Sequence, residues 1–193
     1  MNTPSPPTWP HCAHGADAAT DPVGCRGIHV PGHTTCLAHL TDTDRNIYLT
    51  SLTAGARVDL RGTTFTESLL HDVQTALHNP ATGTVRFGDV RFDSATFKGD
   101  AAFTSATFGG DAAFTSATFE GNVGFSSATF ERDAGFNSTT FKGDAAFTSA
   151  TFEGDAAFSF TTFGGDAAFT SATFEGNVGF SSATFERDAG FNF

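Results

Sequence analysis

Residues 95–119 read ATFKGDAAFTSATFGGDAAFTSATF, and this stretch decides the fold because it shows one short unit repeated without interruption. From Phe97 to Phe191, Phe recurs at intervals that alternate between six and five residues, so the repeating unit has eleven residues. A fixed short period is typical of a chain in which one local structure is copied along an axis. A coiled coil needs seven-residue repeats with apolar gaps of three and four, so this pattern excludes one.

The residues around each Phe alternate like those of a short β-strand. A small residue stands two positions before the Phe, as Ala106 stands before Phe108, with Thr107 between them. Strand side chains alternate between two faces, so Ala and Phe are predicted to point inward and Thr outward. Glycines such as Gly99 and Gly121 lie between successive strands, where we expect the chain to turn through positive φ.

Two eleven-residue units are expected to form one coil of 22 residues with four short sides. The inward Phe should therefore stack in four columns, with neighbours one strand spacing, about 4.8 Å, apart. Phe160, two residues after Phe158, breaks the spacing and is expected to face solvent. One of the predicted columns contains Phe97, Phe119, Phe141, Phe163 and Phe185.

The spacing of a small residue, any residue and then Phe resembles the pentapeptide-repeat family. The resemblance covers about 100 residues of the Phe-rich run and reaches V-D-L-R-G at Val58–Gly62, which T-T-F follows at Thr63–Phe65. It implies an all-β solenoid, a right-handed quadrilateral parallel β-helix. The chain departs from the family by a sixth residue in alternate sides, as at Asp100 and Asp111, which should widen those corners.

The chain is predicted to divide into three regions. Residues 1–40 form a small Cys/His-rich module, residues 41–84 a helical linker and N-terminal cap, and residues 85–193 the β-helix. The linker already contains a first repeat-like turn at residues 56–65.

Two short helices are predicted in the linker. Residues 41–52 begin with Thr41 and Asp44, a pair that caps a helix start. Residues 67–79 carry an apolar face and end before Pro80. We expect the second helix to cover the N-terminal end of the stack, because solenoids need a cap there.

The N-terminal module contains all three cysteines and most of the histidines. Cys25, Cys36 and His39 have C-x10-C-x2-H spacing, and Cys12 would supply a fourth ligand. Thiolates and imidazole suit Zn²⁺, and four protein ligands make a closed structural site. The sequence therefore predicts structural zinc at these four residues, with His14 as a rival for the fourth position.

Two further considerations bear on this site. The last three ligands resemble small treble-clef-like zinc modules that end in G-x-C-x-x-H, although the first gap is longer here. A segment of this length buries too little apolar surface to fold without a stabilising cross-link such as a bound metal. The alternative is three buried reduced thiols with histidines at the surface.

Charge and composition exclude several classes of function. The formal net charge is −11, whereas direct nucleic-acid binding needs clustered Lys and Arg. No stretch approaches the roughly 18 apolar residues of a membrane span, and the Pro-rich start has no secretory pattern, so we expect no membrane association and a cytoplasmic location. Nucleophile, phosphate-loop, dinucleotide and H-E-x-x-H motifs are absent from the sequence, so we expect no enzyme.

An internal copy points to the function. Gly109–Asn137 is identical over 29 residues to Gly164–Asn192, at an offset of 55 residues or two and a half coils. The copies should present the same side chains on opposite walls. A unique catalytic site would not survive such copying, whereas a generic surface would. We therefore predict a non-catalytic scaffold or protein-interaction module with an unknown protein partner.

The resemblance also implies an alternative function. Some acidic pentapeptide-repeat rods occupy the DNA site of a type II topoisomerase as DNA mimics. Here Asp100, Asp144, Asp166 and Asp188 would share one column. Lys98 and Lys142 beside Glu120 would partly neutralise such a surface.

The sequence stops at Phe193 in the middle of a repeat. A last coil without a cap leaves strand edges unpaired, and such edges pair with other chains. Family resemblance also implies C-terminal dimerisation, so we expect a homodimer through Gly176–Phe193, closed by two-fold symmetry.

Overall fold

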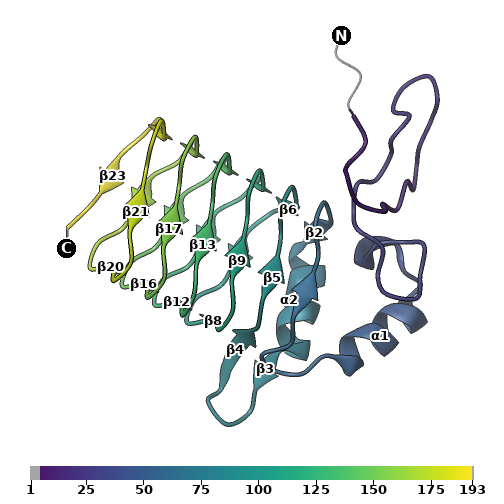
Figure 1. Ribbon diagram of the computed structural model, residues 1–193, viewed down its shortest axis with the longest axis horizontal. Coiled ribbons are helices and arrows are strands. Elements are labelled where there is room, and N and C mark those ends of the chain that lie inside the picture. Colours follow the sequence, from purple (N-terminus) through teal and green to yellow (C-terminus); the bar gives the residue numbers. More distant parts are fainter. Residues whose placement is uncertain (1–4, 193) are drawn as a thin grey trace.

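The computed structural model describes residues 5–192. Figure 1 shows a rod of stacked coils, with the N-terminal segment and α1 (Asp42–Ser51) beside its first coil. The rod is a parallel β-solenoid with four walls, which confirms the predicted fold class. The chain visits the walls in the order 1, 2, 3, 4, so walls 1 and 3 are opposite each other, as are walls 2 and 4.

Each wall is a sheet whose strands come from successive coils. Wall 1 contains β1 (Val58–Asp59), β5 (Val90–Arg91), β9 (Ala112–Ala113), β13 (Ala134–Gly135), β17 (Ala156–Ala157) and β21 (Val178–Gly179). Wall 2 contains β2 (Thr64–Thr66), β6 (Thr96–Lys98), β10 (Thr118–Phe119), β14 (Thr140–Phe141), β18 (Thr162–Phe163) and β22 (Thr184–Phe185). Wall 3 contains β7 (Ala101–Ala102), β11 (Val123–Gly124), β15 (Ala145–Ala146), β19 (Ala167–Ala168) and β23 (Ala189–Gly190). Wall 4 contains β3 (His78–Asn79), β4 (Thr84–Phe87), β8 (Thr107–Phe108), β12 (Thr129–Phe130), β16 (Thr151–Phe152) and β20 (Thr173–Phe174).

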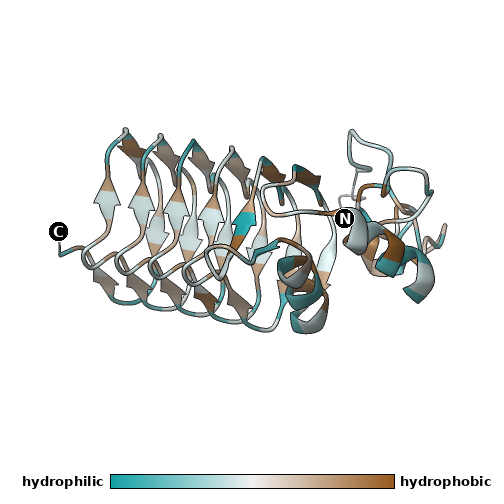
Figure 2. Cartoon of the chain, turned by 90° about the horizontal axis from the view of Figure 1, so that it is seen from below, coloured by the Kyte–Doolittle hydropathy of each residue, from teal (hydrophilic) through white to brown (hydrophobic). Residues whose placement is uncertain are grey.

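The register between coils is 22 residues, as predicted. Thr118 pairs with Thr140 and Phe119 with Phe141, in parallel, so at these positions of wall 2 Thr lies beside Thr and Phe beside Phe in successive coils. Figure 2 shows the result as hydrophobic colour that recurs at the same places in every coil.

The Phe rings fill the interior in four columns. In the column of Phe97 the ring centroids of Phe97 and Phe119 are 4.5 Å apart and those of Phe119 and Phe141 are 5.0 Å apart, with the rings nearly parallel. Rings of different columns meet either edge to face, as Phe103 meets Phe114 at 6.1 Å and 78°, or at a smaller tilt. The predicted columns are confirmed, and so is the exposure of Phe160, whose side chain is 66% exposed.

Most corners are built differently from our expectation. Positive φ is found at Gly99, with φ of 91°, but not at Gly121, and the left-handed residue of most repeats is a serine such as Ser116, with φ of 59°. Ala117 donates its N–H to the carbonyl of Phe114 across that turn. Gly121 is required by close approach instead, because a Cβ there would lie 2.5 Å from the carbonyl of Gly99 in the preceding coil.

Three coils carry threonine in place of the small inward residue of wall 2, namely Thr63, Thr139 and Thr161. Thr139 is fully buried and donates its hydroxyl to the carbonyl of Phe114, at 2.7 Å. Replacing Thr139 with Val removes this bond and should lower the free energy of unfolding by about 1 kcal/mol. Thr140→Val, on the outward face of the next position, is the matched control and should be neutral. Urea denaturation of both variants checks this, and equal effects would contradict it.

α2 (Glu67–Ala76) occupies the position that a strand of wall 3 occupies in the later coils. The Glu67 carboxylate accepts the backbone N–H of Asp100, and the Gln74 side-chain amide donates to the carbonyl of Ala102 in β7. The helix therefore covers the open edge of wall 3, as expected of a cap. It ends at Ala76 rather than Asn79, because His78 and Asn79 pair antiparallel with β4.

Candidate metal centre

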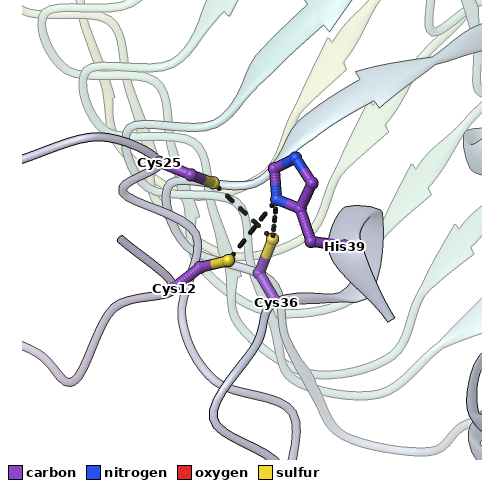
Figure 3. A group of neighbouring side chains, drawn as sticks. All are labelled: Cys12, Cys25, Cys36 and His39. Carbon is purple, nitrogen blue, oxygen red and sulfur yellow. Dashed lines mark hydrogen bonds between the residues drawn. The ribbon is translucent and has the colours of Figure 1, made fainter. Parts of the chain in front are cut away.

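Backbone pairing brings the first two cysteines together. Cys12 donates its N–H to the carbonyl of Gly27, and Ala13 donates to the carbonyl of Cys25, both at 2.9 Å. Cys36 precedes a single 3-10 turn, η1 (Leu37–His39), and His39 is its last residue; the N–H of His39 donates to the carbonyl of Cys36. The turn points both side chains toward the two paired cysteines (Figure 3).

The four ligand atoms form a compact group. They all lie within 4.8 Å of one another. The Sγ atoms of Cys25 and Cys36 are 3.7 Å apart, and Nδ1 of His39 lies 3.4 Å from Sγ of both Cys12 and Cys36. A tetrahedral zinc ion would set sulfur atoms about 3.8 Å apart and sulfur and nitrogen about 3.6 Å apart. The donor set and its dimensions therefore fit a metal ion.

His14 has a different place. Its ring stacks on that of His39, with centroids 4.0 Å apart and planes at 14°. His14 is not a member of the group of ligand atoms. The structure thus brings together Cys12, Cys25, Cys36 and His39, and leaves His14 as a stacking neighbour.

Comparison with known families identifies the rod. The family model for pentapeptide repeats, described as nine copies, matches residues 84–129, 114–162 and 147–193. The chain belongs to the pentapeptide-repeat family. No curated protein and no solved structure matches the chain. In this pentapeptide-repeat protein the candidate metal centre lies outside the matched residues, so family membership does not account for it.

The thiols influence each other strongly in the absence of a metal. The Cys36 S–H donates to Cys25, which together with the N–H of Gly27 and the neighbouring His39 lowers the pKa of Cys25 to about 5 against the opposing effect of burial. The same bond, followed by burial, raises the pKa of Cys36 well above its ordinary value. Within the pair, the hydrogen bond therefore favours the negative charge on Cys25 over Cys36.

Residues that the sequence motif did not indicate hold the centre in place. The Arg45 guanidinium donates to the carbonyls of Leu37 and Leu40 at 3.2 and 3.0 Å, which fixes the turn that carries His39. Gly27 packs under Cys36, where a Cβ would come within 2.7 Å of Sγ. Neither Arg45 nor Gly27 is a ligand type, so the spacing of Cys and His in the sequence could not have revealed these contacts.

The module is joined to the first coil of the rod. Ile28 donates its N–H to the carbonyl of Arg61, and the Arg61 guanidinium lies 4.9 Å from the centre of the Trp9 ring. A cavity of about 460 Å³ opens at this junction. Its lining includes Cys25 and His39 from the module and Thr64, Thr96 and Lys98 from wall 2. One edge of the candidate metal centre therefore faces this cavity.

Proposed function

We propose that this pentapeptide-repeat protein is a non-catalytic scaffold that presents repeated surfaces to a protein partner. One observation carries the proposal: the identical segments Gly109–Asn137 and Gly164–Asn192 lie on opposite walls. Phe114 adjoins wall 1, whereas its counterpart Phe169 adjoins wall 3, and β10 of wall 2 corresponds to β20 of wall 4. The same side chains thus face opposite directions, as suits a surface used more than once.

Affinity capture from the native host, followed by mass spectrometry, identifies the partner. Sedimentation of the purified complex then tests the scaffold, because two equivalent surfaces should bind two partners per chain. Arg132→Glu and Arg187→Glu change equivalent positions of the two copies, and each should remove one of the two partners. A partner that binds once, at a place outside both copies, contradicts the proposal.

The alternative is an acidic DNA mimic that acts on a type II topoisomerase. The net charge of −11 favours it. The corner carboxylates, however, are used within the rod: Oδ1 of Asp144 accepts the N–H of Asp166, and Oδ1 of Asp133 accepts the N–H of Asp155. Lys142 also pairs with Glu120 at 3.3 Å. A competition assay, in which this protein and DNA compete for purified topoisomerase, decides between the two functions. If the protein does not displace DNA at high micromolar concentration, this alternative is wrong.

We further propose that the metal is structural Zn²⁺ held by Cys12, Cys25, Cys36 and His39. Three thiolates and one imidazole are the ligands of structural zinc, and softer ligands disfavour Mg²⁺ or Ca²⁺. Reduced thiols suit the cytoplasm, so that location is part of the proposal. Among the helices of residues 5–192, none is long and apolar enough to cross a bilayer. Elemental analysis of protein purified without chelator should find one zinc per chain, and its absence refutes the assignment.

Self-association through the last coil is also a proposal. β20, β21, β22 and β23 each stand at the end of their sheet, and Val178 is 42% exposed. Phe185 is only partly buried, whereas Phe163 beneath it is fully buried. We propose that, in a polypeptide of these 193 residues, a second copy covers this coil. Light scattering over a dilution series should show a dimer, and a monomer at every concentration contradicts it.

A further inference from the structure

The three cysteines of the metal centre differ in their access to solvent. Cys36 is fully buried. Cys12 and Cys25 are both partly exposed, but of the three cysteines only Cys25 lines the cavity of about 460 Å³. A reagent that enters this cavity therefore meets the sulfur of Cys25 first.

The nearest second sulfur is already in contact. Sγ of Cys36 lies 3.7 Å from Sγ of Cys25, so a small closing movement is enough to reach the disulfide length of about 2.05 Å. Exposure of one thiol beside a resolving thiol is the arrangement of an oxidation-sensitive cysteine pair.

We propose that Cys25 is a site of oxidation by hydroperoxides, with Cys36 as the resolving thiol, and that the disulfide they form releases the metal. This rests on the proposed zinc centre. The Cys25 thiolate attacks the terminal oxygen of the hydroperoxide, the O–O bond breaks, and Cys25 sulfenic acid and an alkoxide form. The Cys36 thiolate then attacks the Cys25 sulfur, forms the S–S bond and expels hydroxide. The two sulfurs together lose the two electrons that the O–O bond gains.

Loss of two thiolates leaves the ion only Cys12 and His39. Four protein ligands close a structural zinc site, so two cannot hold it in competition with a chelator. The expected stoichiometry is one metal ion released and two thiols lost for each hydroperoxide consumed, with the Cys12 thiol remaining free.

The experiment uses the full chain with its metal content determined beforehand. Cumene hydroperoxide is added in the presence of a chromogenic zinc chelator, and free thiols are alkylated afterwards. Cleavage after Arg26 by trypsin and before Asp17 and Asp21 by Asp-N places the three cysteines on separate peptides. We expect zinc release in step with a Cys25–Cys36 bridge and an alkylated Cys12. Release without a bridge, a bridge to Cys12, or oxidised Cys25 with the zinc retained would each overturn the proposal.

A matched pair of variants tests the route through the cavity. Thr96 and Thr140 occupy equivalent outward positions of wall 2, but only Thr96 lines the cavity. Thr96→Trp should slow zinc release by cumene hydroperoxide several-fold, and Thr140→Trp should leave the rate unchanged. Equal rates in the two variants contradict entry through this cavity.

Failure of the zinc assignment gives a different result. Protein that contains no zinc as purified refutes the metal centre alone, and the same oxidation and peptide mapping then report whether Cys25 and Cys36 pair without it. Zinc-loaded protein that keeps its metal and its thiols under hydroperoxide refutes the oxidation alone.

Discussion

Removing the metal should unfold the N-terminal module and leave the coils of the rod in place. The module has few buried apolar side chains, among them Val23, Val30, Leu37 and Leu40. Structural zinc contributes about 10–16 kcal/mol of apparent binding free energy, and in a module this small that is folding free energy. Cys36→Ser, which removes a buried ligand, should have the same effect as a chelator.

Hydrogen exchange followed by mass spectrometry measures this. After chelation, amides in residues 5–40 should lose protection, whereas those of walls 1–4 beyond residue 95 should keep it. His33→Ala changes a nearby histidine outside the ligand group and is the matched control. Protection that persists in residues 5–40 of the chelated protein would show that the module folds without a metal.

Truncating one ring of the central stack should cost about 3–5 kcal/mol. Phe136 is fully buried between Phe114 and Phe158, at centroid distances of 4.8 and 4.9 Å. Phe136→Ala removes both stacking contacts and leaves a cavity that rigid neighbouring coils cannot close. Because coils in a solenoid are stabilised by their neighbours, we expect the loss to spread along the rod.

Phe160→Ala is the control with the same change in side chain. Phe160 is 66% exposed and has a φ of 59°, which is unfavourable for a bulky residue. Its truncation should leave the stability unchanged or slightly raised. Urea denaturation of both variants gives the comparison, and a similar loss in the two would mean that burial of the Phe columns does not stabilise the rod.

The sequence contained most of the information about the rod. The alternating six- and five-residue gaps set the coil length, the inward faces and the stacking of Phe97 on Phe119. The corner conformation was not predictable in this way. Ser116 adopts positive φ, whereas Gly121 is required because a Cβ there would clash with the carbonyl of a residue 22 positions earlier. The end of α2 depended likewise on pairing between β3 and β4.

The candidate metal centre was predicted as a set of residues but not as an environment. C-x10-C-x2-H spacing marked Cys25, Cys36 and His39, since residue types near in sequence can be read directly. The choice of Cys12 over His14 depended on the pairing of Cys12 with Gly27 and on the stacking of His14 against His39. The cavity that exposes Cys25 exists because the module meets wall 2, which no local pattern encodes.

An eleven-residue unit in a 22-residue coil has a consequence for how such a gene can change. Duplication or loss of two units lengthens or shortens the rod by one layer of about 4.8 Å and leaves every downstream side chain facing as before. Duplication of one unit preserves the Phe columns equally well, yet turns everything downstream through half a revolution. The parity of the unit count therefore decides which side of the rod a surface residue occupies, and recombination between repeats can redirect a binding face without altering a single core residue.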